Sequence, residues 1–197
     1  MRIGLTGGIG SGKSTVAAAL VARGGALLVD TDAISRALTS TDGGAMSAIE
    51  ATFGPAFIAG NGALDRAAMR ELAFRDPQAK RALEAILHPM IGAETARQAA
   101  LARPGQRIVF DVPLLVESGR WRRLVDRVLV VDCRVDTQVA RVIARSGLSE
   151  VAVRAILAQQ ATRAQSRAAA DAVIHNDGLT IEQLQDEVAL LLTSPLF

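Results

Sequence analysis

The sequence has 197 residues, half of them hydrophobic, and a mean hydropathy of +0.26, so it can bury the core of a folded domain and is not a disordered tail. A net charge of +2 with 3% aromatic residues disfavours a nucleic-acid-binding surface. No apolar run approaches the roughly 20 residues of a membrane span, and no signal peptide is evident. The single cysteine, Cys133, fits a reducing compartment. We therefore expect a cytoplasmic protein without membrane contact.

The chain begins with two short predicted strands separated by a helix. Arg2–Thr6 is predicted to be a short buried strand that leads into a cluster of glycines. After Lys13, apolar residues recur at helical spacing, and Gly24-Gly25 supplies a helix stop. Ala26–Asp30 is the second predicted strand. This order is typical of the start of a parallel α/β domain.

Residues 33–103 have helical patterns and no convincing strand. Asp65–Phe74 and Pro77–Leu87 are the clearest helices, and Asp76 is the expected N-cap of the second, with proline at its first position. The pattern stops at His88-Pro89 and then resumes. We therefore expect separate helices on either side of this proline.

The remaining strands lie in the second half of the chain. Ile108–Asp111 and Val128–Asp132 are apolar runs that end in aspartate, and Val173–His175 is the last predicted strand. A capping box at Thr180–Gln183 opens a leucine-rich C-terminal helix. Strands that alternate with helices predict a parallel sheet covered by helices on both faces.

Residues Gly7–Ser14 read GGIGSGKS and match the phosphate-loop pattern G-x-x-x-x-G-K-[ST] in full, between a predicted strand and a predicted helix. Glycines let successive N–H groups turn toward phosphate oxygens, and the positive end of the following helix adds to the attraction. The alternative is a chance glycine-rich turn. We expect the ATP contacts in this segment to come from Gly8, Gly10, Ser11, Gly12, Lys13, Ser14 and Thr15, with Lys13 at the β- and γ-phosphates and Ser14 holding Mg²⁺.

The predicted fold class is accordingly α/β, a three-layer α/β/α P-loop NTPase fold with a parallel sheet of about five strands. Residues 1–32, 104–140 and 171–197 would form its nucleotide-binding core. The two helical segments that exceed simple crossovers, residues 33–103 and residues 141–170, would be insertions. Ligands of open α/β sheets bind at the carboxyl ends of the strands, so both segments are expected over that edge.

Other nucleotide-binding classes lack their signatures here. The only lysines are Lys13 and Lys80, and neither lies in the Asn-Lys-x-Asp motif that reads the base in GTPases; D-x-x-G is missing as well. The chain is too short for a motor or transporter ATPase with accessory domains. A kinase that phosphorylates a small molecule is the interpretation that remains.

Two aspartates at predicted strand ends are candidates for the chemistry. A kinase needs a carboxylate that orients the acceptor hydroxyl and takes its proton, and Asp32, just after the second strand, is our candidate for this base. The alternative is a helix N-cap, a role that suits Asp30 or Thr31 better. Asp111 is a candidate for supporting Mg²⁺ through water, or else a strand-end aspartate bonded to local backbone.

An ordered set of motifs resembles the dephospho-CoA kinase family over essentially the whole chain. The set comprises Thr6–Thr15, Asp30–Arg36, Leu87–Pro89, Val112–Glu117, Gln138–Arg141, Gln159-Gln160 and Asp171–Asn176. The resemblance implies ATP and dephospho-CoA as substrates, and the phosphorylation of the ribose 3′-hydroxyl to give CoA and ADP, the last step of CoA synthesis. It implies that residues 33–103 bind the coenzyme and that residues 141–170 form a lid that carries arginine. It implies no obligate protein partner.

The resemblance also implies roles for individual residues on the acceptor side. Asp32 matches the family's proposed base. The substrate-binding positions would be Asp32, Arg36, His88, Pro113, Leu114 and Glu117. For His88 the alternative is a packed histidine at a helix end, and for Glu117 it is a surface carboxylate.

On the ATP side, the resemblance implies that Arg141 meets the transferring phosphoryl group from the lid. Gln138, Arg141 and Arg145 share one helix face, and Arg145 is a second candidate for ATP contact, with a solvated arginine face as the alternative. Asn176 would lie beside the adenine, a role open to nearby backbone as well. His175 departs from the polar or acidic residue expected there.

Two other functions remain open on the residues alone. The first is a kinase for another small acceptor, such as a nucleoside monophosphate or shikimate, although the Asp-Gly-x-Pro-Arg element of nucleoside monophosphate kinases is missing. The second is a regulator that binds ATP without turnover. Release of ADP with and without dephospho-CoA separates these possibilities.

Overall fold

The computed structural model describes all 197 residues, which divide into two compact units. The first comprises Met1–Val29 and Ala102–Phe197, and the second Asp30–Leu101. None of the helices combines the length and the apolar character that a membrane span requires. The predicted assignment of residues 141–170 to a lid stays a prediction.

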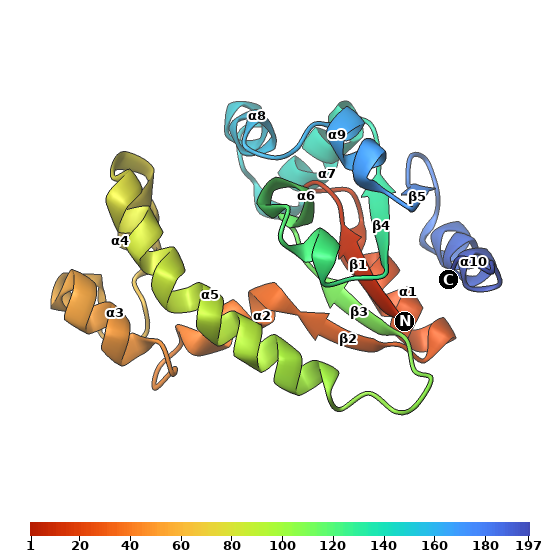
Figure 1. Cartoon of the computed structure of the whole chain (residues 1–197). Helices are drawn as coiled ribbons and strands as arrows, with labels where there is room; N and C mark the ends of the chain where they lie inside the picture. Colours follow the sequence, from red (N-terminus) through yellow and green to blue (C-terminus); the bar gives the residue numbers. More distant parts are fainter. The chain divides into compact units, whose positions relative to one another are not determined.

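The first unit is built on a five-stranded sheet in the order β2-β3-β1-β4-β5 (Figure 1). β1 pairs in parallel with β3 and with β4, and β4 pairs in parallel with β5. The predicted parallel α/β sheet is thereby confirmed. The strands are β1 (Arg2–Thr6), β2 (Leu27–Asp30), β3 (Ile108–Asp111), β4 (Arg127–Asp132) and β5 (Ala172–His175).

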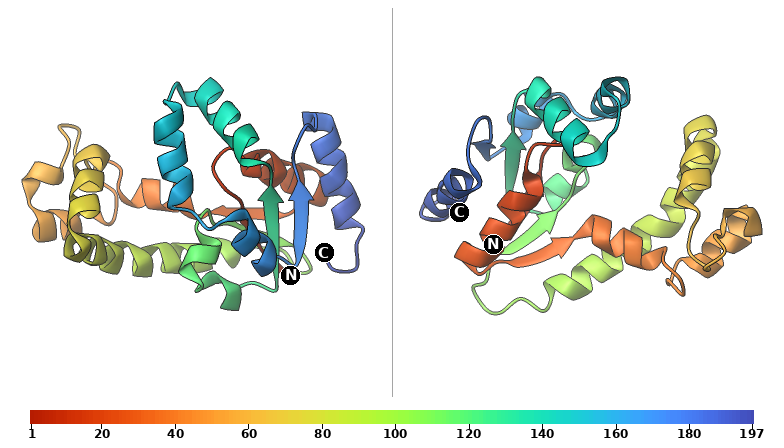
Figure 2. Two further views of the ribbon diagram at one scale, coloured as in Figure 1. Left: turned by 90° about the horizontal axis from the view of Figure 1, so that it is seen from above. Right: turned by 180° about the vertical axis from the view of Figure 1, so that it is seen from behind.

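Helices cover both faces of this sheet. On one face, Leu20 of α1 (Lys13–Gly24) and Val188 of α10 (Ile181–Leu192) pack with the β1 side chains of Ile3 and Leu5. Figure 2 shows β4 and β5 side by side and α10 next to β5. On the other face, a Cβ on Gly4 would lie 2.6 Å from a methyl of Leu115, in α6 (Leu115–Ser118).

The remaining helices of the first unit follow β3 and β4. The 3₁₀ turn η2 (Trp121–Arg123) packs Trp121 on Phe110 of β3, with ring centroids 5.6 Å apart. After β4 come α7 (Val135–Ser146), α8 (Glu150–Ala158) and α9 (Arg163–Ala169). With helices on both faces of one sheet, the unit is a three-layer α/β/α structure.

The second unit is helical, as predicted for this part of the chain. It contains α2 (Thr31–Leu38), α3 (Met46–Phe53), the 3₁₀ turn η1 (Pro55–Phe57), α4 (Arg66–Arg75) and α5 (Pro77–Ala99). Its core is a separate cluster around Met46, Ile49 and Met69.

The predicted helix end at Leu87 is wrong. α5 runs from Pro77 to Ala99 with Pro89 inside it. Proline removes one helical hydrogen bond and disfavours a helical residue before it. Leu83, Leu87 and Met90, on both sides of the proline, all pack onto the core of the second unit, and this packing holds the helix together across the interruption.

Candidate functional site

The phosphate loop joins β1 to α1 and needs glycine at two of its positions. Gly10 has a φ of 77° and Gly12 a φ of 95°, values in the left-handed region that other residues avoid. Gly12 is also the N-cap of α1, and a Cβ on it would overlap the side-chain amide of Asn176. The chain therefore reaches the first turn of α1 in a shape that leaves the positive end of the helix beside the loop.

The ammonium of Lys13 forms an ion pair with Oδ1 of Asp111 at the carboxyl end of β3. The parallel register places Leu5 of β1 opposite Asp111, so the carboxylate lies beside the segment that enters the loop. Asp111 is buried, and Ser14, in the first turn of α1, is exposed.

The oxygen donors of Ser14 and Asp111 fit Mg²⁺. A hydroxyl and a carboxylate are the hard ligands this ion takes, and two protein groups suffice because Mg²⁺ keeps several waters and binds substrate phosphates. No group of three or more His, Cys, Asp or Glu side chains in the chain forms an all-protein metal cage.

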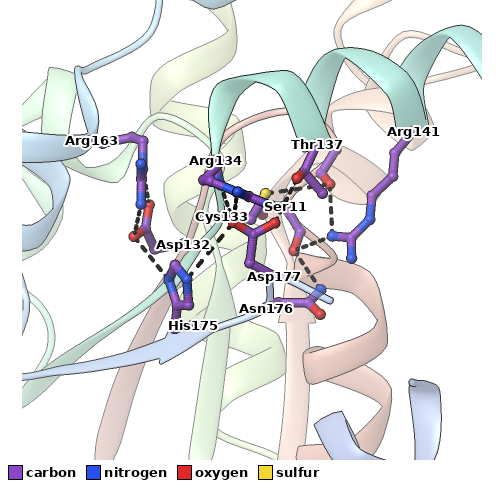
Figure 3. Close-up of polar contacts among 11 residues, drawn as sticks. Ser11, Asp132, Cys133, Arg134, Thr137, Arg141, Arg163, His175, Asn176 and Asp177 are labelled. Carbon is purple, nitrogen blue, oxygen red and sulfur yellow. Dashed lines mark hydrogen bonds and ion pairs between the residues drawn. The ribbon is translucent and has the colours of Figure 1, made fainter. Parts of the chain in front are cut away.

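Two predicted ATP-site residues contact the backbone of the loop (Figure 3). The buried side-chain amide of Asn176, just after β5, donates a hydrogen bond to the carbonyl of Ser11 at 2.7 Å. Nη1 of Arg141 in α7 lies 3.4 Å from the carbonyl oxygen of Gly10 and 3.5 Å from that of Ser11. Arg145, one turn further along α7, is exposed.

Two glutamines hold the peptide groups of Ile9. Nε2 of Gln138 donates to the carbonyl of Ile9 at 2.8 Å, and Oε1 of Gln160 accepts from its N–H at 3.0 Å. Both glutamines lie in motifs of the family resemblance, but no contact was predicted for either of them. One signal could have pointed to them: each is a neutral amide in a motif of the nucleotide site. A helix face that only contacts solvent would more often carry charged residues at such positions.

A second polar cluster lies at the ends of β4 and β5 (Figure 3). Arg163 of α9 makes two hydrogen bonds of 2.7 Å to the buried carboxylate of Asp132, and Nδ1 of His175 lies 3.4 Å from it. Hydrogen bonds from Arg163, above all, lower the pKa of Asp132 against the effect of burial. This ion pair fastens the start of α9 to the carboxyl end of β4.

The turn after β5 is held to α7 in the same region. Oδ1 of Asp177 accepts from the hydroxyl of Thr137 at 2.5 Å, and Oδ2 accepts from Nε of Arg134 at 2.6 Å. These bonds, first that from Thr137, lower the pKa of Asp177. The turn that carries Asn176 is thus fixed relative to α7.

A cavity of about 510 Å³ lies beside the loop, and Gly7 and Gly8 form part of its wall. The rest of the wall comes from the end of β4, from α7, α8 and α9, and from the α8–α9 link, where Gln160, Ala161 and Thr162 line the cavity. The volume lies in the range of small-molecule sites. Cys133 is itself buried, and burial raises the pKa of its thiol to about 11, so it is not a nucleophile at neutral pH.

In the second unit, the structure separates the roles of two neighbouring aspartates. Asp30 is the N-cap of α2, and its Oδ1 accepts from the N–H of Ala33 at 2.8 Å. Asp32 is exposed in the first turn of the helix and is not its cap. The alternative role considered for Asp32, a helix cap, is therefore wrong.

The other acceptor-side candidates of this unit are exposed. Nη2 of Arg36 lies 3.5 Å from Oδ2 of Asp30. His88 lies in the middle of α5, so it is not a packed histidine at a helix end.

The acceptor-side candidates of the first unit follow β3. The carbonyl of Pro113 accepts a hydrogen bond from the hydroxyl of Thr6, and Leu114 is about half exposed. Oε1 of Glu117 accepts from the N–H of Ala161 at 2.6 Å. Glu117 thereby contacts the link between α8 and α9.

Comparison with known proteins shows which kinases this chain resembles in sequence. A protein-family model described as dephospho-CoA kinase matches residues 1–182. The dephospho-CoA kinase of Bordetella pertussis is 60% identical over 179 residues, which are 91% of this chain and 83% of that protein. The dephospho-CoA kinase of Burkholderia lata is 57% identical over 189 residues, 96% of this chain and 93% of that protein.

Solved structures share the fold. TT1252 from Thermus thermophilus has a TM-score of 0.84 at 34% identity and covers 98% of both chains. The dephospho-CoA kinase from Campylobacter jejuni has a TM-score of 0.69 at 24% identity, with 96% of this chain and 94% of that chain covered. Shikimate kinase from Acinetobacter baumannii in complex with shikimate has a TM-score of 0.56 at 15% identity, with coverages of 96% and 91%.

The fold prediction and the family resemblance are both confirmed by these matches. The structural neighbours share a P-loop kinase-like α/β fold, and the family match spans nearly the whole chain with relatives above half identity. The chain belongs to the dephospho-CoA kinase family.

Proposed function

We propose that the chain transfers the γ-phosphoryl group of ATP to the ribose 3′-hydroxyl of dephospho-CoA, giving ADP and CoA. The family match over residues 1–182 supports the substrates. The observation that carries the chemistry is the phosphate loop in its left-handed glycine geometry, with Lys13 beside it. Such a loop binds a nucleoside triphosphate through backbone N–H groups and the helix N-terminus.

In this proposal the loop and Lys13 hold the β- and γ-phosphates. Lys13 exchanges part of its interaction with Asp111 for the phosphate oxygens, and its charge offsets the negative charge of the transferring group. Ser14 would hold Mg²⁺ directly, and Asp111 would support it through water. When bound, Mg²⁺ neutralises charge on the β- and γ-phosphate oxygens.

Asp32 is the proposed base. The oxygen of the 3′-hydroxyl forms a bond to the γ-phosphorus as the bond from that phosphorus to the β–γ bridging oxygen breaks. The hydroxyl proton passes to the Asp32 carboxylate, and ADP leaves with the bridging oxygen. Its exposure in the first turn of α2, with the cap position already taken by Asp30, supports this role.

The other candidates bind the two substrates. Arg141 acts on the transferring phosphoryl group, and its place beside the loop carbonyls supports this role. Arg145 and Asn176 contact ATP. The acceptor contacts are Arg36, His88, Pro113, Leu114 and Glu117. We further propose that the enzyme works in the cytoplasm, where ATP is available, without nucleic acid, membrane or an obligate protein partner.

Release of ADP, measured by a coupled assay, tests the proposal. ADP should form with ATP, Mg²⁺ and dephospho-CoA, and phosphate should be found on the 3′-oxygen of the product by ³¹P NMR. Shikimate and AMP serve as competing acceptors because the fold is shared with shikimate kinase. Turnover with shikimate alone would identify a different kinase, and binding of ATP without any turnover would identify a regulator.

A further inference from the structure

Ile9, inside the phosphate loop, has both of its backbone polar groups bound by side chains distant in sequence. Gln138 donates to the carbonyl of Ile9 at 2.8 Å, and Gln160 accepts from its N–H at 3.0 Å. Chemistry fixes the direction of each bond, because a carbonyl only accepts and an N–H only donates. Gln138 is 5% exposed, so its side chain is held within the protein.

This double contact holds the part of the loop that lies before the carbonyls of Gly10 and Ser11, which Arg141 and Asn176 contact. Gly7, Gly8, Gly10 and Gly12 give the segment the freedom that its shape requires, and glycine loses more conformational freedom on ordering than any other residue. A loop that is ordered before the nucleotide arrives spares ATP binding that loss. In this segment, Ile9 is the one residue whose backbone N–H and C=O are both hydrogen-bonded by side chains.

The position of Gln160 is itself fixed by its neighbours in the α8–α9 link. The N–H of Ala161 binds Glu117 at 2.6 Å, and Arg163 makes its two bonds to Asp132. The link therefore connects the phosphate loop to the segment after β3 and to the end of β4. Gln138 is fixed separately, on the buried side of α7.

We propose that Gln138 and Gln160 are positioning residues for phosphoryl transfer, which keep the phosphate loop in its ATP-binding shape by holding the two peptide groups of Ile9. They contact the loop and act through it on the nucleotide. The inference rests on the proposed kinase function, but its first readout is nucleotide binding, which needs no acceptor.

The test uses the opposite hydrogen-bonding demands of the two sites. In Gln160→Glu the new carboxylate still accepts from the Ile9 N–H. In Gln138→Glu it has no hydrogen to donate and faces the Ile9 carbonyl. Both variants keep the side-chain size and add one negative charge beside the loop. They differ in the hydrogen bond and in burial, since Gln138 is 5% exposed and Gln160 is half-buried, and the melting temperature reports the cost of burying the charge. Gln78→Glu, on the exposed start of α5, controls for net charge.

Isothermal titration with ADP and ATP, circular-dichroism melting and steady-state kinetics are measured on each variant. We expect Gln138→Glu to weaken ATP binding about tenfold or more, and Gln160→Glu to stay within about threefold of the wild type. Gln160→Met, which fills the same space but replaces the amide oxygen by a weakly accepting thioether, should weaken ATP binding as Gln138→Glu does. KM for dephospho-CoA should change little in all of them.

Equal weakening in the two Gln→Glu variants would show that charge alone acts and would overturn the proposal. Wild-type ATP affinity in Gln138→Glu and Gln160→Met would overturn it as well. A lowered melting temperature with unchanged nucleotide affinity would show that the two glutamines have only a structural role, and it would also overturn the proposal. Failure of the kinase proposal looks different, because the wild type would then bind ATP but not phosphorylate dephospho-CoA.

Discussion

The ammonium of Lys13 and the carboxylate of Asp111 form an ion pair that connects the first residue of α1 to the last residue of β3. Both side chains are mostly shielded from solvent, so their charges interact in a medium less polar than water. The pair holds Lys13 at the loop before a nucleotide is present. A triphosphate would meet a cation that is already in place, close to Asp111 and Ser14, the two residues that we propose as oxygen donors for Mg²⁺.

Lys13→Ala should remove nearly all kinase turnover. The substitution removes the cation that we propose for the β- and γ-phosphates, where a positive charge positions and stabilises the transferring group. Lys80→Ala is the matched control, since Lys80 is the only other lysine and its side chain is 62% exposed on α5. Turnover is measured by ADP release. A Lys13→Ala enzyme that keeps more than about a tenth of the wild-type rate would refute this role for the lysine.

Arg141→Ala should lower kcat far more than it raises KM for dephospho-CoA. An arginine that meets the transferring phosphoryl group contributes roughly 10³-fold or more to the rate, and an interaction made in the transition state appears in kcat. Steady-state kinetics with both substrates varied give the two constants separately. An unchanged kcat would mean that Arg141 serves only the loop carbonyls it contacts here.

Asp132→Asn should destabilise the fold in a pH-dependent way. The pKa of Asp132 is lowered by Arg163, so the ion pair contributes stability above the ordinary aspartate pKa of 3.8, and that contribution is lost as pH falls through the lower folded value. Because Arg163 is about a third exposed, we expect a loss of about 1–2 kcal/mol at pH 7.

Urea titrations of wild type and Asp132→Asn at several pH values check this dependence. The difference in free energy of unfolding should be largest near neutral pH and shrink below about pH 4. Arg122→Ala is a control, because its contact with Asp171 is more exposed and should contribute less. A difference that stays constant down to pH 3 would contradict the assignment.

Cys133 should resist alkylation in the folded protein. Its thiol is buried and burial raises its pKa to about 11, so almost no thiolate is present at pH 8. Labelling by iodoacetamide, followed by mass spectrometry, should be slow for the native chain and fast in urea. Above pH 9 the thiol ionises more readily in the unfolded chain, so the folded state should lose stability there. Rapid labelling of the native protein would contradict this account.

Local sequence rules predicted the elements well where the signal lies within a few residues. The strand at Ile108–Asp111 has the predicted bounds, Gly25 ends α1 in a left-handed conformation, and Asp76 caps α5. The capping box at Thr180 is confirmed too. Each of these depends on neighbouring side chains and backbone, which the sequence displays directly.

The same local rules could not predict contacts between residues that are distant in the sequence. Gln138, Gln160 and Asn176 contact Ile9 and Ser11 across 129 to 165 positions, and an amide carries no charge or periodicity that points to its partner. The continuity of α5 across Pro89 also depends on packing in the assembled unit, which outweighs the local preference of proline.

The most direct measurement for the proposed mechanism is turnover of Asp32→Asn with dephospho-CoA, together with its melting temperature. Asparagine keeps the shape but cannot take the hydroxyl proton, so turnover should fall by about two orders of magnitude or more. ATP affinity and the melting temperature should hardly change, since Asp30 is the residue that caps α2. Near-normal turnover with a normal melting temperature would contradict the assignment of Asp32 as the base.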